Sequence, residues 1–443
     1  MGLAPSRPDD ETIQSLRDGS HLVAVRAAAA IASADILLVT IGEGLGEGLL
    51  CYSCAERGVG RDMADLERFY GFWGHLFNET RKKPAHEAYR YVSKWCTERF
   101  EGTATATEVK RRAALAGSPE EGESVPHTGS WKRCGALGNA LRGSGEIVID
   151  LGTASDEEDD EDSGDEALSQ LPYDSHAPSR AGAFHVFTSL VDGHAARMLG
   201  SHVVRECRGS VQLWQCGAAG GPCRDSDAWE APEGFAFRTD ATPAGRLAPV
   251  GVPEARPPVF AVPMYNGGCM DRALSVAAGF KDNWPVCRSC AAAPARPALL
   301  LGPSDAAGWS DLDDRRERYA KWRRVALGLA KEGRARVVVL ELGGEPAPPC
   351  GPCQYCDSAA RRDARGSDRA WTAVRQESES FACEVLASGS PAEPASVTLV
   401  RVSDSLPLAD RPEAAACTLS LCMPAVEALA AIDRELGALR KQG

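Results

Sequence analysis

The feature that most constrains the fold is a set of short apolar segments in which hydrophobic residues do not alternate with polar ones. Strands that are buried on both faces have this pattern, and they occur mainly in parallel sheets covered by helices. Such segments lie at Asp35–Ile41, Ala183–Ser189, His202–Cys207, Pro297–Gly302, Arg336–Leu342 and Ser396–Val402. The sequence therefore predicts a sheet that is buried on both sides.

Helix-like segments fall between several of these strands, at 21–34, 318–333, 371–388 and 424–440. Strands that alternate with helices predict the α/β class, with a Rossmann-like, doubly wound parallel sheet. The chain of 443 residues is long enough for such a domain and a smaller one. Apolar residues at helical spacing in the segment 72–77 (Phe72, Trp73, Leu76 and Phe77) are expected to be core.

The charge of the chain bears on its partners. The net charge of −13 argues against a direct nucleic-acid partner. Much of this charge lies in the run SDEEDDEDSGDE at Ser155–Glu166. Such a run is typical of a solvated, disordered insert, and docking of a basic protein partner is the alternative.

No apolar run is long enough to cross a bilayer, so no membrane partner is expected. Gly2 and Ser6 fit the myristoylation pattern, but one acyl chain binds membranes only marginally, and no anchor is expected. Sixteen cysteines without a signal segment predict an intracellular location, cytoplasmic or nuclear, where thiols stay reduced.

Two close cysteine pairs, joined by a long loop, predict a structural zinc site. Cys216 and Cys223 form the first pair, and Cys287 and Cys290 form the second. Tetrahedral Zn²⁺ prefers soft, deprotonated sulfur ligands, and a CxxC spacing places two of them on one turn. The alternative is a set of scattered reduced thiols. For Cys350, Cys353 and Cys356, we favour exposed thiols over a second metal site.

These patterns divide the chain into segments. The Rossmann-like domain is predicted at 20–100, together with a helical module, and continues at 182–215, 296–345 and 371–443. Between these parts we predict an acidic, low-complexity and disordered insert at 101–181, a small zinc-binding domain at 216–295, and an insert rich in Cys, Pro and Arg at 346–370.

A glycine-rich loop, TIGEGLGEGLL, follows the first predicted strand. Gly42, Gly44 and Gly46 would let the backbone approach a ligand closely, and such a loop can cradle a pyrophosphate. Glu43 and Glu47 place negative charge where a phosphate would lie, which opposes this interpretation. A purely structural turn is equally compatible with the loop.

Together with this loop and the cysteine pairs, several longer motifs resemble one family. They are YGFWGHLFNETRKKPAHEAYRYVSKW, FTSLVDGHAARMLGSHVVRECRGSVQLWQC, VVVLELGG and VRQESE. The chain resembles the sirtuin-type NAD-dependent protein deacylases, most closely their divergent bacterial-like branch. The resemblance implies a Rossmann-type NAD domain, a smaller zinc-bearing domain and an acyl-lysine peptide in the cleft between them. It also implies NAD contacts from Gly42, Gly44, Gly46, Thr188, Ser189, Asp192, Gly343, Gly344 and Ser403.

The chain departs from this family at the positions that carry the family's catalytic residues. Asp192 is retained as a catalytic residue, but Arg208 stands where the family has its catalytic histidine, and Leu190 stands where it has an asparagine. A guanidinium has no lone pair and stays protonated, so Arg208 cannot act as the base. Loss of a general base costs roughly 10²–10⁴ in rate.

Three partners for Arg208 remain open: Glu206, Glu43 or a bound phosphate. His194 could replace the missing base, although a packing or helix-capping role is favoured. The resemblance implies a protein-lysine deacetylase or deacylase with weak or no activity. The alternative is a non-catalytic binding protein of the same fold that holds NAD, ADP-ribose or a basic protein partner.

Overall fold

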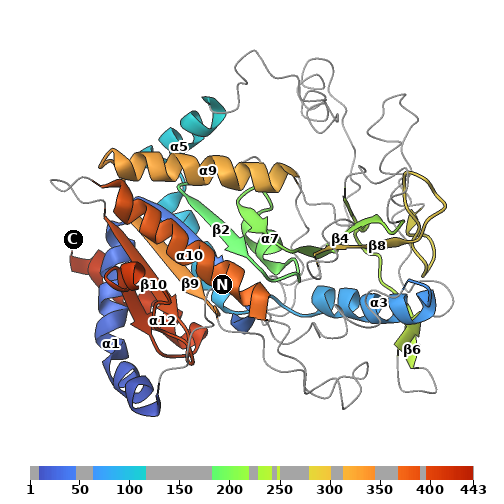
Figure 1. The fold of residues 1–443 in the computed structure, drawn as a ribbon, viewed down its shortest axis with the longest axis horizontal. Coiled ribbons are helices and arrows are strands. Elements are labelled where there is room, and N and C mark those ends of the chain that lie inside the picture. The colour runs from blue at the N-terminus through green and yellow to red at the C-terminus, as the bar shows by residue number, and fades with distance from the viewer. Residues whose placement is uncertain are drawn as a thin grey trace, which may run out of the picture.

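The main sheet contains six parallel strands in the order β3-β2-β1-β9-β10-β11 (Figure 1). The computed structural model describes residues 9–45, 63–115, 182–218, 228–241, 247–249, 279–300, 313–344, 368–389 and 396–442. The strands are β1 (Ile36–Ile41), β2 (Phe184–Thr188), β3 (Val204–Glu206), β9 (Val337–Leu342), β10 (Val397–Val402) and β11 (Thr418–Leu421). This order is that of a Rossmann fold, which confirms the predicted class.

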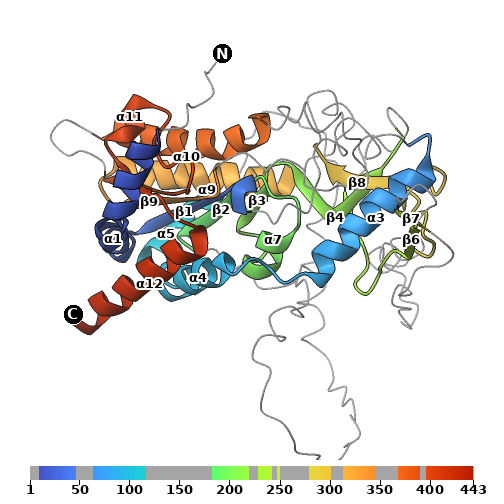
Figure 2. The ribbon, with the colours of Figure 1, turned by 90° about the horizontal axis from the view of Figure 1, so that it is seen from below.

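Helices cover both faces of the sheet. On one face lie α1 (Asp10–Ser33), α4 (Ala88–Trp95) and α12 (Ala425–Gln442), and on the other lie α9 (Asp313–Lys331) and α10 (Asp368–Ser388) (Figure 2). Helix α1 shows how the sequence produces this packing. Three of its buried residues are alanines at helical spacing (Ala24, Ala27 and Ala28), so the helix can approach β11 and α12 closely.

Shorter elements connect these layers. They are η1 (Glu43–Leu45), the π-helix η2 (Cys96–Phe100), α5 (Ala104–Leu115), α7 (His194–Leu199) and α11 (Pro412–Ala415). Helix α5 lies inside the segment that the sequence analysis predicts as a disordered insert. It packs on α9 and buries Ala106 and Val109, so this part of the segment is helical. Residues 116–181 of the predicted insert and 346–367 of the second insert lie outside the described residues.

A second lobe lies beside the Rossmann-like one, to the right in Figures 1 and 2. Its three-stranded antiparallel sheet contains β4 (Gly209–Cys216), β5 (Trp229–Glu230) and β8 (Ala295–Leu299), in the order β5-β4-β8. A two-stranded sheet contains β6 (Thr239–Ala241) and β7 (Leu247–Pro249).

Strand β8 overlaps the segment Pro297–Gly302, whose pattern favours the parallel sheet, but it pairs with β4 instead. A continuous apolar run shows that a strand is buried without showing which sheet it joins. The sixth parallel strand is β11, TLSL, which is short and partly polar and was not predicted.

Helix α3 (Leu66–Lys82) supplies six of the eighteen buried residues in the core of the second lobe. Its aromatic residues pack on Trp214 of β4 and on Phe237, and the predicted core residues Phe72, Trp73, Leu76 and Phe77 are all buried. In the part of the chain that the structure describes, no helix combines the length and the apolar character that a bilayer span requires.

Candidate functional site

The carboxyl edge of the parallel sheet brings together residues that lie far apart in the sequence. Ligands of doubly wound sheets bind at this edge, at the point where the strand order reverses, which here lies between β1 and β9. At or just beyond the strand ends at this edge lie Gly42, Thr188, Ser189, Glu206, Gly343, Gly344 and Ser403. Gly46 lies outside the described residues.

The glycines at this point allow two backbone segments to meet. A Cβ atom on Gly42 would collide with the carbonyl of Gly343, and one on Gly344 would collide with the carboxylate of Glu341. The N–H of Gly44 donates to the Gly343 carbonyl over 3.0 Å, and Gly343 has a φ of 61°. These glycines are therefore used at least for protein packing.

The three predicted hydroxyl groups differ in their surroundings. Thr188 Oγ1 donates to the Ile41 carbonyl at 3.0 Å, and Ser403 Oγ accepts the N–H of Leu406 at 2.9 Å. Ser189 is fully buried, and its hydroxyl has no hydrogen-bond partner among the described residues. An unsatisfied buried hydroxyl is costly, so Ser189 is the best-placed of the three to bind a polar ligand or a water.

Asp192 and His194 form a local turn at the start of α7. The Asp192 carboxylate accepts the backbone N–H of His194 at 2.8 Å and lies 3.6 Å from its Nδ1. His194 Nε2 lies 2.9 Å from the carbonyl of Thr80, so Nε2 must carry the hydrogen. The buried imidazole thus links α7 to α3, which is a packing role.

Arg208 lies in the turn between β3 and β4, and its guanidinium faces Glu43. Nη1 lies 3.6 Å from Glu43 Oε1, and both side chains are buried or nearly so, with 12% and 5% exposed. Nε donates to the carbonyl of Leu300 at 3.3 Å, and the Leu300 N–H donates back to the Arg208 carbonyl at 3.0 Å. Of the protein partners left open by the sequence, the structure selects Glu43.

Glu206 is instead paired with Arg315 of α9. Both side chains are buried, and Arg315 also lies 4.0 Å from Glu230 of β5, so it bridges the two sheets. Burial raises the pKa of Glu206 to about 7, because the charged form loses its hydration. The nearby Asp192 and Glu230 raise the pKa further, while Arg315 opposes the shift.

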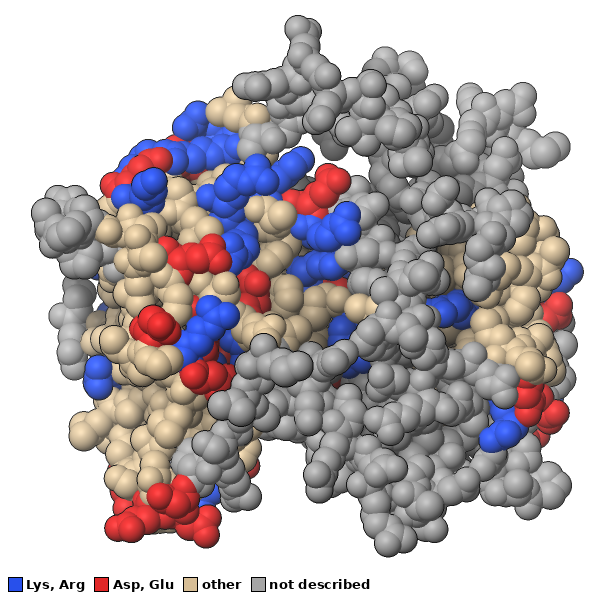
Figure 3. Space-filling model, viewed as in Figure 1, with Lys and Arg blue, Asp and Glu red and all other residues tan. Residues whose placement is uncertain are grey.

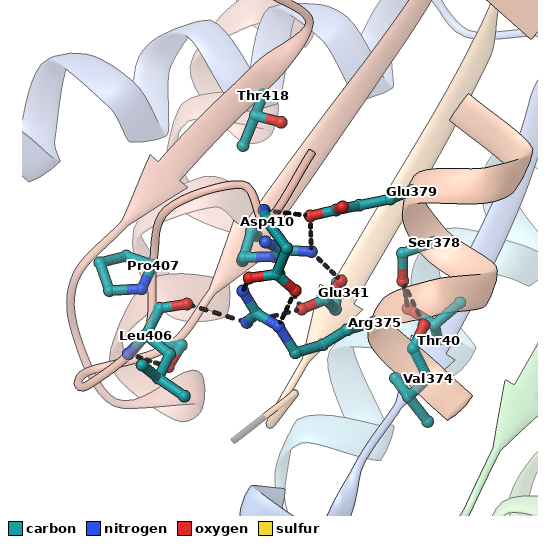
Figure 4. Close-up of polar contacts among 12 residues, drawn as sticks. Thr40, Glu341, Val374, Arg375, Ser378, Glu379, Leu406, Pro407, Asp410 and Thr418 are labelled. Atoms are coloured by element: carbon teal, nitrogen blue, oxygen red, sulfur yellow. Dashed lines mark hydrogen bonds and ion pairs between the residues drawn. The ribbon is translucent and has the colours of Figure 1, made fainter. Parts of the chain in front are cut away.

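On the other side of β1, a buried charge network fixes the loop that follows β10 (Figure 4). Arg401 of β10 lies beside Glu341 of β9 in the sheet register, with 2.8 Å between Nε and Oε1. Arg375 of α10 binds Asp410 at 2.6 Å and donates to the loop carbonyls of Leu406 and Leu408. Sequence reasoning missed this network, although one charge in each of two otherwise apolar strands was a signal.

Three of the four predicted zinc ligands converge in the second lobe. The sulfur atoms of Cys216, Cys287 and Cys290 lie within 4.8 Å of one another, with the first two residues buried and the third half-buried. Cys216 ends β4, and the other two lie on a turn next to β8. Cys223 lies outside the described residues.

The donor set suits a zinc ion. In a tetrahedral site with Zn–S bonds of about 2.3 Å, the sulfurs lie roughly 3.8 Å apart, so only a small contraction is needed. The N–H of Ser289 points to Cys287 Sγ at 3.3 Å, and that of Ala293 points to Cys290 Sγ at 3.5 Å. Such donors orient thiolates and stabilise their charge. The three cysteines thus form a candidate metal site.

The comparisons with known proteins add no family assignment. The sequence matches no protein-family model, and no curated protein is significantly similar to it.

Proposed function

We propose that the chain is a sirtuin-type protein that binds NAD or ADP-ribose at the carboxyl edge of its parallel sheet and deacylates lysine weakly or not at all. The motifs quoted above support this proposal, as does the combination of a Rossmann-like sheet with a second lobe that holds a cysteine cluster. In this proposal Cys223 completes a four-thiolate zinc site whose role is structural.

The observation that carries the proposal is the pairing of Arg208 with Glu43. A general base needs a free lone pair within reach of the proton that it accepts. At this position the chain has a guanidinium, which has none, held between Glu43 and the carbonyl of Leu300. His194 is held in a packing position, with its Nε2–H donated to the carbonyl of Thr80 and its Nδ1 facing Asp192, and we do not assign it the role of the base.

NAD would be recognised here by a limited set of groups. Ser189 offers a hydroxyl that has no hydrogen-bond partner among the described residues, and Asp192, three residues later in the sequence, has a side chain that is 17% exposed. The buried carboxylate of Glu43 opposes a tight pyrophosphate contact, but its charge is balanced by Arg208. We therefore expect a modest affinity for the nucleotide.

A non-catalytic binding protein is the second candidate. It is favoured by the acidic run Ser155–Glu166, which a deacylation site does not require and which suits a basic protein partner. An acyl-lysine peptide would then be bound without turnover.

The test measures nucleotide binding and turnover separately. Calorimetry with NAD and with ADP-ribose tests binding, and nicotinamide release in the presence of an acetyl-lysine peptide tests chemistry. We expect binding by the natural chain and release near background. The variant E43Q/L190N/R208H should release nicotinamide roughly 10²-fold faster or more. The variant R26H, which changes an exposed arginine on α1, is the matched control.

Absence of binding by both nucleotides would refute the nucleotide site. Brisk turnover by the natural chain would refute the assignment of Arg208 as an inactivating residue.

A further inference from the structure

Helix α9 and the neighbouring α5 present a basic surface on a chain that is acidic overall. Figure 3 shows Lys and Arg gathered over these two helices. We call this surface the α5–α9 face and define it by its exposed or half-exposed cations, which are Lys110, Arg111, Arg316, Arg318, Lys321, Arg324 and Lys331. Such a concentration of one sign of charge attracts an anionic partner.

Several of these cations are not neutralised within the described part of the chain. Lys110, Lys321, Arg324 and Lys331 make no ion pair there, whereas Arg323 is held by Glu377 and Glu384. Arg324 and Lys331 are seven residues apart, so they lie in one row along the helix, roughly 10 Å from each other. The α5–α9 face therefore carries positive charges without an ion pair in the described part of the chain, from Lys321 to Lys331 along α9.

The chemistry of the face favours a short acidic peptide over a nucleic acid. Tyr319 and Trp322, the aromatic residues of α9, are buried against the sheet and offer no stacking surface to bases. The net charge of −13 repels a long polyanion, whereas a short acidic segment feels mainly the local field within a Debye length of about 8–10 Å.

The chain itself contains such a segment. The run Ser155–Glu166 holds nine acidic residues and no basic one, so without it the net charge would change from −13 to −4. The segment that carries the run leaves the fold at Leu115, the end of α5, where Arg112 pairs with Glu332 just after α9.

After the segment that carries the run, the chain re-enters the fold at the edge of the parallel sheet where the strands begin. Strand β2 starts there at Phe184. Strand β9, which closely follows α9, starts at the same edge at Val337, on the other side of β1. Sixteen residues separate Glu166 from Ala183, and these span at most roughly 60 Å. Since the 19 residues of α9 extend over about 28 Å, the run can reach the whole face.

We propose that the acidic run Ser155–Glu166 binds the α5–α9 face of its own chain. Because the two are covalently joined, binding benefits from a high effective concentration and does not depend on protein concentration. A basic protein partner of the run must then compete with α9, which makes its recruitment sensitive to ionic strength and to the charge of this helix.

Zero-length crosslinking tests this proposal on the full chain. A carbodiimide joins a lysine amine to a carboxylate that it contacts, with loss of water, and mass spectrometry identifies the joined residues. At low salt, we expect the run to crosslink to Lys110, Lys321 and Lys331. Crosslinks to Lys82 on α3 should stay at background, since this exposed lysine lies in the other lobe. High salt should reduce the α9 crosslinks to the level of Lys82.

Two variants sharpen the result. In R316Q/R318Q/R324Q the crosslinking lysines remain, but their yield with the run should fall, while the control K82Q/K83Q should leave it unchanged. Circular dichroism checks that both variants are folded. Crosslinks spread evenly over all exposed lysines would overturn the proposal. So would crosslinks that occur only between chains with different isotope labels, because these would assign the run to a second copy.

Discussion

The buried pair of Glu206 and Arg315 leads to a pH dependence of stability that can be worked out from the structure. Burial raises the pKa of Glu206 from 4.5 to about 7 in the folded chain. Between these values the folded state holds a proton that the unfolded state has lost, so the stability falls as the pH rises through this window. At about 1.4 kcal/mol per pH unit, the loss amounts to about 3 kcal/mol between pH 4 and pH 8.

The substitution E206Q isolates this effect. Glutamine keeps a similar shape but does not titrate, and its substitution removes the ion pair with Arg315, which adds an offset that changes little with pH. Urea unfolding of both proteins at several pH values gives the difference in the free energy of unfolding. We expect this difference to shift by about 3 kcal/mol in favour of E206Q as the pH rises from 4 to 8.

The exposed Glu317 on α9 provides the control, since E317Q should show no such shift. A difference between E206Q and the natural chain that stays constant within about 0.5 kcal/mol would refute the reasoning. It would mean that Arg315 keeps Glu206 ionised at all these pH values.

Two further predictions concern the metal site and the buried charge network. Emission spectroscopy should find about one zinc per chain. The variant C287S should lose the metal and have a lower melting temperature, whereas the control C383S on α10 should do neither. Zinc below half an equivalent in the natural chain would contradict this prediction. The substitution R401M should lower the free energy of unfolding by about 3–5 kcal/mol in urea titrations, because it removes the main ion-pair partner of the buried Glu341. A loss under about 1 kcal/mol would show that the network is not needed for stability.

The elements that could be predicted are those with a strong local pattern. The strand Val337–Leu342 and the helix Asp313–Lys331 are examples, since a continuous apolar run or a helical period depends on few neighbours. Sheet membership was harder, because β8 and β9 have the same kind of sequence and differ only in their partners. Helix α5 was missed since its Ala- and Thr-rich sequence gains stability from packing on α9.

For the site, composition and spacing predicted that Cys216, Cys287 and Cys290 lie together but not which charges do. Glu206 and Arg315 are more than a hundred residues apart, and only the fold brings α9 next to β3. By contrast, Glu341 and Arg401 both lie at the fifth position of a six-residue strand. Their contact follows from the parallel register of β9 and β10, so the pair could be predicted once the two strands are known to be neighbours.

The contact between Arg208 and Glu43 affects what a substitution of Arg208 by histidine would do. A histidine at position 208 would be neutral for much of its time near pH 7, and it would remove the positive charge that Arg208 places beside the buried carboxylate of Glu43. That carboxylate follows Gly42 directly, at the strand end where a pyrophosphate would bind, and with less positive charge beside it the carboxylate would repel the phosphates more strongly. Replacing the arginine alone would therefore supply a base and weaken nucleotide binding at the same time. We therefore expect R208H alone to release less nicotinamide than E43Q/L190N/R208H in the assay proposed above.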